Sequence, residues 1–160
     1  SKNDYIYWVG NKKVSYAKYK DGMVSDKKEL DSIGNMQSIV FLKASGELVY
    51  INSEAKLINA VKGDKTVIAE NVKDGSLSLI NNTKESITYI DNDGQYYLKT
   101  PSAKKVLMGN VTDTVNTSDT SLYRKRLYYY GSDKTLYSCD LKGGSKSQIG
   151  TVDRLWIGTH

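Results

Sequence analysis

A repeat of about 40 residues limits the folds open to this chain more than any other feature. The segment KTVIAENVKD (residues 65–74) aligns without a gap on KKVLMGNVTD (residues 104–113), which is a shift of 39 residues. Such a period is typical of folds built from small repeated units, each of which packs on its neighbours to bury its apolar face. The sequence therefore predicts an array of similar units rather than one irregular core.

Each unit contains four short runs separated by turn residues. The second run carries Tyr or Trp, the third follows a tight turn, and the fourth begins with lysines. Turn segments such as DNDG (91–94) and GSDK (131–134) supply residues that tolerate positive φ between paired strands. We therefore expect antiparallel meanders of four strands. The first run is apolar, and its copies are SIVFL from Ser38, SLSLI from Ser76, SLY from Ser121 and RLWI from Arg154.

The two ends of the chain predict how the array closes. The first unit lacks a first strand, and the C-terminal segment DRLWIGTH (153–160) contains a first strand with nothing after it. Docking the last strand on the first unit completes it and leaves no open edge. The predicted fold is thus all-β, a β-propeller of about four four-stranded blades in one domain, 1–160. The blades are 5–34 plus 154–158, 38–72, 76–112 and 121–152.

Other arrangements of the same repeats stay open. Two copies can exchange C-terminal strands and form an eight-bladed ring, so that a monomer and a strand-exchanged dimer both fit the sequence. The chain can also be a piece of a larger propeller. A β-sandwich is a weaker alternative, because a sandwich needs no period near 40.

The repeat also predicts which residues are buried. First strands are apolar on successive residues, as expected for strands covered on both faces, and fourth strands begin with lysines, as expected for exposed edges. The single Cys139 lies in a strand-like run and is expected to be a buried, inert thiol. Four aromatic residues fall at one equivalent position and are expected to pack between blades: Trp8, Tyr50, Tyr89 and Tyr129.

Two long segments, YIYWVGNKKVSYAKYKDG (5–22) and RLYYYGSDKTLYSCDLKGG (126–144), resemble the repeats of YWTD-type and related bacterial propellers. Residues 69–100 are similar to repeats of extracytoplasmic bacterial propeller domains carried behind a membrane anchor. The resemblance implies a cell-surface or secreted location, with any anchor in a segment before Ser1. The segment YWVG (7–10) keeps two of the four YWTD residues and lacks the Asp, so a role tied to that Asp is not carried over.

Composition narrows the classes of partner. The formal net charge is +5, but the lysines are spread along the whole length, so a nucleic-acid interface is not expected. No run of 18 apolar residues is present, and no membrane span is expected in this segment. One Cys and one His, His160, cannot supply a metal site or an activated nucleophile, so we expect no metal, no cofactor and no catalytic residues of that kind.

The favoured function is a non-enzymatic recognition module that binds a protein, a peptide or a cell-surface glycan on one propeller face. Turns between second and third strands share one end of the ring with the connections between units, and the long connection at 110–120 is expected to form the rim of the site. The alternative is a carbohydrate-active hydrolase or lyase with acidic residues at the ring mouth. The candidate binding residues are Asn11, Asn52, Asp91, Asp93, Asp133, Thr114, Asn116 and Asp119.

Overall fold

The structure is a computed structural model that describes residues 4–115 and 126–156. The chain divides into two compact units, the N-terminal unit (Ser1–Leu77) and the C-terminal unit (Ser78–His160). Each unit contains two antiparallel sheets with a shared apolar core. The units are therefore described one at a time.

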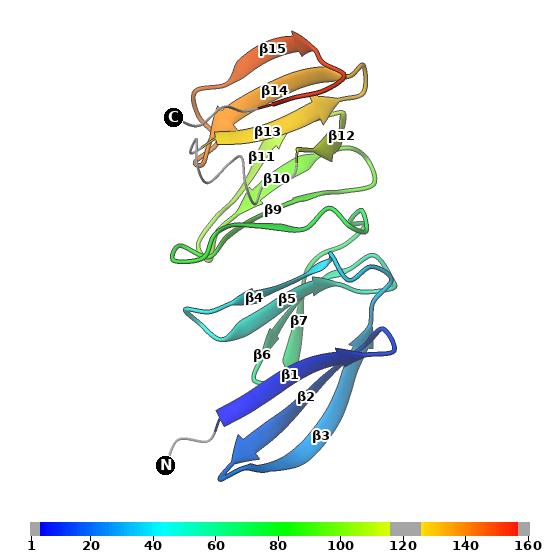
Figure 1. The fold of residues 1–160 in the computed structure, drawn as a ribbon, viewed down its shortest axis with the longest axis vertical. Helices are drawn as coiled ribbons and strands as arrows, with labels where there is room; N and C mark the ends of the chain where they lie inside the picture. Colours follow the sequence, from blue (N-terminus) through cyan, green and yellow to red (C-terminus); the bar gives the residue numbers. More distant parts are fainter. Residues whose placement is uncertain (1–3, 116–125, 157–160) are drawn as a thin grey trace. The chain divides into compact units, whose positions relative to one another are not determined.

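The N-terminal unit contains a three-stranded sheet, in the order β1-β2-β3, and a four-stranded sheet, in the order β4-β5-β6-β7. Consecutive strands pair antiparallel, so both sheets are simple meanders (Figure 1). The strands are β1 (Asp4–Gly10), β2 (Lys13–Lys20), β3 (Met23–Ser32), β4 (Ile39–Leu42), β5 (Glu47–Ile51), β6 (Leu57–Val61) and β7 (Asp64–Ala69).

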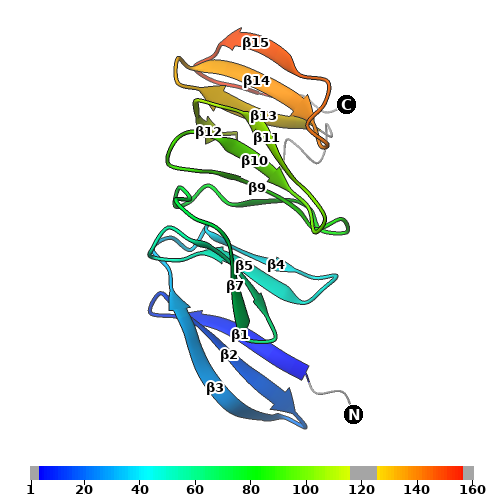
Figure 2. The same ribbon diagram turned by 180° about the vertical axis from the view of Figure 1, so that it is seen from behind.

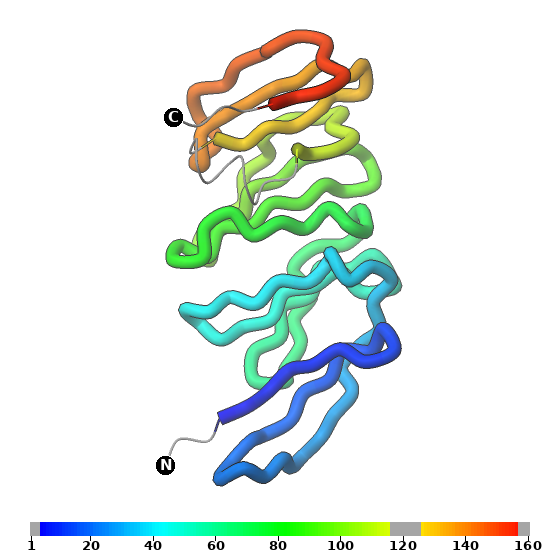
Figure 3. The backbone as a smooth tube through the Cα atoms, viewed as in Figure 1, coloured from blue at the N-terminus to red at the C-terminus, as the bar shows by residue number. Residues whose placement is uncertain are grey.

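The C-terminal unit contains two four-stranded meanders, β8 to β11 and β12 to β15, which Figure 2 shows from behind. The smooth trace in Figure 3 makes the same up-and-down path visible in every sheet. The strands are β8 (Ser78–Asn81), β9 (Ser86–Ile90), β10 (Tyr96–Lys99), β11 (Lys104–Met108), β12 (Val111–Thr114), β13 (Arg126–Gly131), β14 (Thr135–Asp140) and β15 (Ser147–Thr151).

The predicted all-β class and the repeated antiparallel meanders are confirmed, and three of the four sheets have four strands. The first sheet has three, because no strand precedes β1 in the described part of the chain. Residues 154–156 belong to no strand, Trp156 is 77% exposed, and residues 157–158 lie outside the described residues. Ring closure by 154–158 therefore stays a prediction.

The fourth sheet begins earlier than the sequence indicated. Its first strand is β12, which pairs with β13 from Val111↔Gly131 to Thr114↔Tyr129. Thr114 thus lies in a strand, although we expected the whole 110–120 connection to be a loop. The run from Ser121 that we assigned as this first strand lies outside the described residues. The difference arises because VTDT alternates polar and apolar residues too weakly to be recognised as a strand without its partner.

The core of the N-terminal unit lies between its two sheets. Buried residues of the first sheet, such as Val14 and Leu30, pack with Leu48, Tyr50 and Ile58 of the second sheet. In the C-terminal unit the core is formed in the same way by residues of β8 to β11 and of β12 to β15, including Tyr96, Leu107, Leu127, Tyr129 and Cys139. Cys139 is buried as expected, and burial raises the pKa of its thiol.

Burial varies with position in the sheet. The lysine-led fourth strands are mostly exposed, as predicted. The first strands are less covered than predicted, since Phe41 in β4 is 45% exposed. The second strands of the next two sheets are more buried, with four of five residues of β5 and all five of β9 buried. The reason is that β4 and β8 lie at sheet edges, whereas β5 and β9 have a strand on each side.

The aromatic position of the second strands behaves as predicted in three sheets only. Tyr50, Tyr89 and Tyr129 are buried, whereas Trp8 is 38% exposed. In β1 the neighbouring Tyr7 points to the core instead. Side chains of a strand alternate between its two faces, and Trp8 therefore lies on the face of β1 opposite to Tyr7 and the core.

Candidate functional site

The turns that carry the predicted binding residues share one hydrogen-bonding pattern. Asn52 Oδ1 accepts hydrogen bonds from the backbone N–H groups of Glu54 and Lys56, both at 3.0 Å. Asp91 Oδ1, 39 residues later, accepts them from Asp93 at 3.0 Å and Gln95 at 2.9 Å. A side chain that bonds the backbone two and four residues ahead fixes the turn itself. These two residues are therefore explained by hairpin formation.

A second contact attaches each of these turns to the connection that leaves the same sheet. The turn contains a residue with positive φ, and its carbonyl oxygen accepts a hydrogen bond from a backbone N–H beyond the last strand of the sheet. The contact occurs in all four sheets, so it is a structural device of the repeat. The pairs are Ile33 N to Lys12 O (2.9 Å), Val72 N to Ala55 O (2.8 Å), Val111 N to Gly94 O (2.9 Å) and Val152 N to Lys134 O (3.2 Å).

Asn52 and Asp91 form further hydrogen bonds with their other side-chain atoms. Asn52 is buried, and its amide donates to Asp31 Oδ2 at 3.2 Å, an oxygen that Tyr50 OH also contacts at 3.2 Å. Asp91 Oδ2 accepts from Tyr97 OH at 3.2 Å. The contacts of both side chains therefore stabilise the fold.

The other predicted site residues lie in or beside the same turns. Asn11 is a turn residue with φ 50°, and Asp133 Oδ1 accepts from Thr135 N at 3.1 Å. Hydrogen bonds from the Thr135 side chain and backbone lower the pKa of the Asp133 carboxyl. Asn116 and Asp119 lie outside the described residues. Binding by Asn11, Asn52, Asp91, Asp93, Asp133 and Thr114 stays a prediction.

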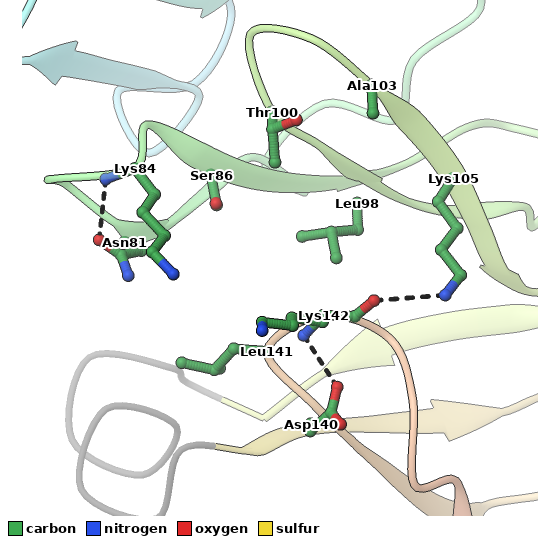
Figure 4. Close-up of a pocket in the computed structure, with 10 residues that line it drawn as sticks. All are labelled: Asn81, Lys84, Ser86, Leu98, Thr100, Ala103, Lys105, Asp140, Leu141 and Lys142. Atoms are coloured by element: carbon green, nitrogen blue, oxygen red, sulfur yellow. Dashed lines mark hydrogen bonds between the residues drawn. The ribbon is translucent and has the colours of Figure 1, made fainter.

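The C-terminal unit has a pocket at the other end of its sheets. This pocket of about 600 Å³ is bordered by the β8–β9 turn, the β10–β11 turn and the β14–β15 turn. Figure 4 shows Leu98 of β10 pointing into this space, toward the turn that carries Leu141 and Lys142. Pockets of roughly 300–1,000 Å³ are the usual size for small ligands and for side chains of a bound segment. We call this space the lysine pocket; its lining is Asn81, Lys84, Ser86, Leu98, Thr100, Ala103, Lys105, Asp140, Leu141 and Lys142.

The same gap in the N-terminal unit is filled by tyrosines. Tyr7 pairs with Tyr16 across β1 and β2, and these rings lie 5.4 Å apart between centroids, with Tyr5 at 5.7 Å from Tyr7. Tyr5 OH donates to Gly46 O at 2.8 Å, and Tyr7 OH donates to Ala60 O at 3.3 Å. We call Tyr5, Tyr7 and Tyr16 the tyrosine cluster.

The register shows what replaces the tyrosine cluster in the C-terminal unit. The pair Tyr7–Tyr16 corresponds to Thr88–Leu98 of β9 and β10, and Ser86 stands two residues before Thr88, as Tyr5 stands two before Tyr7. Smaller side chains at these positions leave volume unfilled between the sheets. The lysine pocket therefore exists because three tyrosines are missing.

The rim of the pocket is basic and its floor is apolar. Lys105 Nζ donates to Lys142 O at 3.3 Å, which joins β11 to the β14–β15 turn. Asp140 Oδ1 accepts from the backbone N–H groups of Gly144 (2.8 Å) and Lys142 (2.9 Å), and these bonds lower the pKa of its carboxyl. Leu98 is buried and Leu141 is half-buried. The pocket thus offers aliphatic contacts next to three ammonium groups.

Sequence analysis missed this site altogether. In the sequence, lysines 84, 105 and 142 belong to a charge that is spread evenly along the chain. An alignment of the repeats locates strands but does not compare the volumes of facing side chains. The available signal was the pair of small or aliphatic residues, Ser86 and Leu98, at positions where the first unit has Tyr5 and Tyr16. That signal has meaning only once the facing sheets are known.

The N-terminal unit has a second, different opening. An apolar groove of about 410 Å³ lies between β1 and the β4 region and is lined among others by Trp8, Met36 and Phe41, which are 38%, 56% and 45% exposed. Among the residues that the structure describes, no group of three His, Cys, Asp or Glu side chains is placed to hold a metal ion. No helix in residues 4–115 and 126–156 has the length and apolar character of a membrane span.

Comparisons with known proteins give only distant structural likenesses. No protein-family model matches the chain, and no curated protein matches it. YCF48 from Cyanidioschyzon merolae is similar to 90% of this chain, with 14% identity and a TM-score of 0.46. A structure of YCF48 bound to D1 peptide is similar to 88% of this chain, with 18% identity and a TM-score of 0.44. The chain spans 58% and 50% of the lengths of these two proteins.

Proposed function

We propose that this chain is a non-enzymatic recognition module whose lysine pocket binds a segment of a protein or peptide. The observation that carries the proposal is the contrast between the units: an inter-sheet gap that three tyrosines fill in one unit is open in the other, with an apolar floor and a polar rim. An unfilled gap forgoes packing energy, so it is expected where a ligand supplies the missing contacts.

The acidic residues support binding over hydrolysis. A general acid in glycoside hydrolysis needs a raised pKa, whereas hydrogen bonds lower the pKa of the carboxyls of Asp133 and Asp140. Asp91 is occupied with its own turn and with Tyr97. The described carboxylates thus act as parts of turns in this proposal.

The proposed architecture is a four-bladed propeller in which residues 154–158 complete the first sheet. The support is that β1 has a partner only on the β2 side in the described part of the chain, while the other sheets have one strand more. The exposed side chains of Trp8 and Phe41 adjoin that free edge and would be covered. Removing residues 153–160 is expected to lower the melting temperature, and an unchanged melting curve would disprove closure. An extracytoplasmic location is proposed from the resemblance of residues 69–100 alone.

The test of the binding proposal is to fill the pocket. Ser86→Tyr with Leu98→Tyr places tyrosines where the N-terminal unit has them, and Ala103→Trp blocks the mouth from an exposed turn. The probe is a displayed library of random twelve-residue peptides selected on the wild-type chain. Selected peptides should bind both filled variants at least about tenfold more weakly, as expected when the main contact site is lost.

A matched control separates blocking from unfolding. Ser25→Tyr adds a tyrosine at an exposed position of β3, far in sequence from the pocket, and should leave peptide binding unchanged. Melting curves show whether each variant is folded. A library that yields no binder, or binders that ignore both filled variants, would overturn the proposed function.

A further inference from the structure

Among the described residues around the lysine pocket, positive charges outnumber negative ones. Three lysines and one aspartate line it, and the aspartate is committed to the β14–β15 turn through two backbone N–H groups. Of the ion pairs within 4.0 Å that the described residues form, none includes Lys84, Lys105 or Lys142. The pocket therefore favours an anionic group of its ligand.

Apolar contacts lie within the same space. Leu98 is buried at its floor, and Leu141 is half-buried in the β14–β15 turn next to Lys142. A ligand that fills the pocket must thus present an apolar group and an anion side by side. A peptide meets this requirement with two neighbouring side chains, or with one side chain and a terminal carboxylate.

The lining also distinguishes among anionic ligands. Among its described residues none is aromatic and none is arginine. Proteins bind nucleic-acid bases by stacking them on aromatic rings or arginines, and the flat apolar faces of sugars also suit aromatic platforms. Lysine instead acts as a flexible point charge, which suits a carboxylate on a mobile segment. The lining of the pocket therefore favours an acidic peptide as its ligand.

We infer that the ligand of the lysine pocket is a peptide segment that places a carboxylate beside an aliphatic side chain. The inference rests on the proposed function, since it names the ligand of the same site. Lys84 and Lys142 bind the carboxylate from two different turns, and Leu98 and Leu141 contact the aliphatic side chain. Lys105 holds the β14–β15 turn in place through its bond to Lys142 O.

The experiment uses three acetylated tripeptides as probes, two with an amidated C-terminus and one with a free C-terminus. Acetyl-Leu-Asp-Leu-amide carries a side-chain carboxylate, acetyl-Leu-Asn-Leu-amide is its neutral isostere, and acetyl-Leu-Asn-Leu with a free C-terminus carries only a terminal carboxylate. Binding is followed by amide shifts in NMR spectra of the ¹⁵N-labelled full chain. The aspartate peptide should bind at least about fivefold more tightly than its isostere, and raising the salt should reduce this advantage.

Charge variants locate the carboxylate. Lys84→Gln and Lys142→Gln should each weaken binding of the aspartate peptide by about two- to fivefold and leave binding of the neutral peptide unchanged. Lys20→Gln, at the exposed end of β2, is the matched control and should change neither. Tighter binding of the free C-terminal peptide than of the aspartate peptide would identify a terminal carboxylate as the group recognised.

The outcomes separate this inference from the proposed function. If acidic and neutral peptides bind equally and both are blocked by Ser86→Tyr with Leu98→Tyr, the site is real and the inference is overturned. If no peptide binds in a way that the filled variants block, the proposed function fails. Preferential binding of an oligosaccharide of glucuronic acid over every peptide would also overturn the inference.

Discussion

The N-terminal and C-terminal units use the same repeat but differ in how they fill the space between their sheets. In the N-terminal unit the tyrosine cluster occupies the end of the core near the turns, and its hydroxyls bond to Gly46 O and Ala60 O. In the C-terminal unit Ser86, Thr88 and Leu98 take the corresponding positions, and the lysine pocket remains. The comparison teaches that one scaffold forms either a filled core or an open pocket between its sheets, depending on three side chains.

The two units agree where the backbone is concerned. In every sheet a backbone N–H beyond the last strand donates a hydrogen bond to the carbonyl oxygen of a positive-φ turn residue. Turn geometry is therefore the constant part of the repeat, and inter-sheet side chains are the variable part. Function is expected in the variable part, because it can change without disturbing the pairing of strands.

The largest expected difference comes from truncating matched core residues. Tyr16→Ala should lower the free energy of unfolding by about 3–5 kcal/mol, because it removes a buried ring that contacts Tyr5 and Tyr7 and leaves a cavity. Leu98→Ala should cost only about 2 kcal/mol, the lower end for leucine, because this side chain already borders open space. Denaturant unfolding of both variants measures the two costs. Equal costs would mean that the pocket is as well packed as the tyrosine cluster.

Alkaline pH should distinguish the units through their buried tyrosines. Burial raises the pKa of two tyrosines in the N-terminal unit, Tyr7 and Tyr50, and of four in the C-terminal unit, Tyr89, Tyr96, Tyr97 and Tyr129; that of Tyr89 rises to about 12. The pKa is raised in the folded chain, so the stabilisation is complete below the unfolded value of about 10 and is lost as the pH rises toward 12. For each tyrosine that stays protonated in the folded chain, the free energy of unfolding should be about 1.4 kcal/mol lower at pH 11 than below pH 10.

Hydrogen exchange between pH 9 and pH 11 measures this difference by region. Protection in β9, β10 and β13 should fall more steeply with pH than protection in β5, after correction for the intrinsic exchange rate. Tyr89→Phe should reduce the slope in the C-terminal unit, since it removes one titrating hydroxyl that has no hydrogen-bond partner among the described residues. Equal slopes in both units would contradict the assignment.

Much of the backbone could be predicted from the sequence, because the signals for it are local. Asn52 and Asp91 stand 39 residues apart and form the same turn, so a repeat found by alignment also locates the hairpins. Lysines at the start of the fourth strands correctly marked exposed edges. These features depend on a few neighbouring residues, and the alignment compares such residues directly.

The candidate site could not be predicted, because it depends on faces that meet across two sheets. The two-residue turn at Asn11 and Lys12 differs from the longer turn at Asp91–Gly94, and Tyr7 rather than Trp8 faces the core. Aligning Trp8 with Tyr89 also aligns Tyr7 with Thr88, but the importance of side-chain volume at this position follows only from knowing which sheets face each other. The sequence places carboxylates in the turns, which favours them as binding residues. The structure shows that those of Asp91 and Asp133 accept hydrogen bonds from backbone N–H groups of their own turns.

The smallest expected effect concerns the turn geometry that all sheets share. It is tested at the positive-φ turn residue, which is Ala55 in the N-terminal unit and Gly94 in the C-terminal unit. Ala55 and Gly94 both accept the hydrogen bond from beyond the fourth strand, with φ of 60° and 85°. An L-residue with a side chain pays about 1–2 kcal/mol in the left-handed region, and glycine does not. Ala55→Gly removes this cost but gives the unfolded chain more freedom, so a net gain of about 0.5 kcal/mol is expected.

The reverse change should act in the opposite direction and more strongly. A Cβ at Gly94 would lie 3.3 Å from Asn110 Cα and 3.4 Å from Asn110 N, so Gly94→Ala combines backbone strain with a tight contact and should cost about 2 kcal/mol. Ala103→Gly is the control, because Ala103 has no positive φ, and this change should only destabilise, by about 0.5–1 kcal/mol. Urea unfolding of the three variants gives the signs. If Ala55→Gly destabilises as Ala103→Gly does, the turn at Ala55 is not strained, and the two units differ in backbone as well as in side chains.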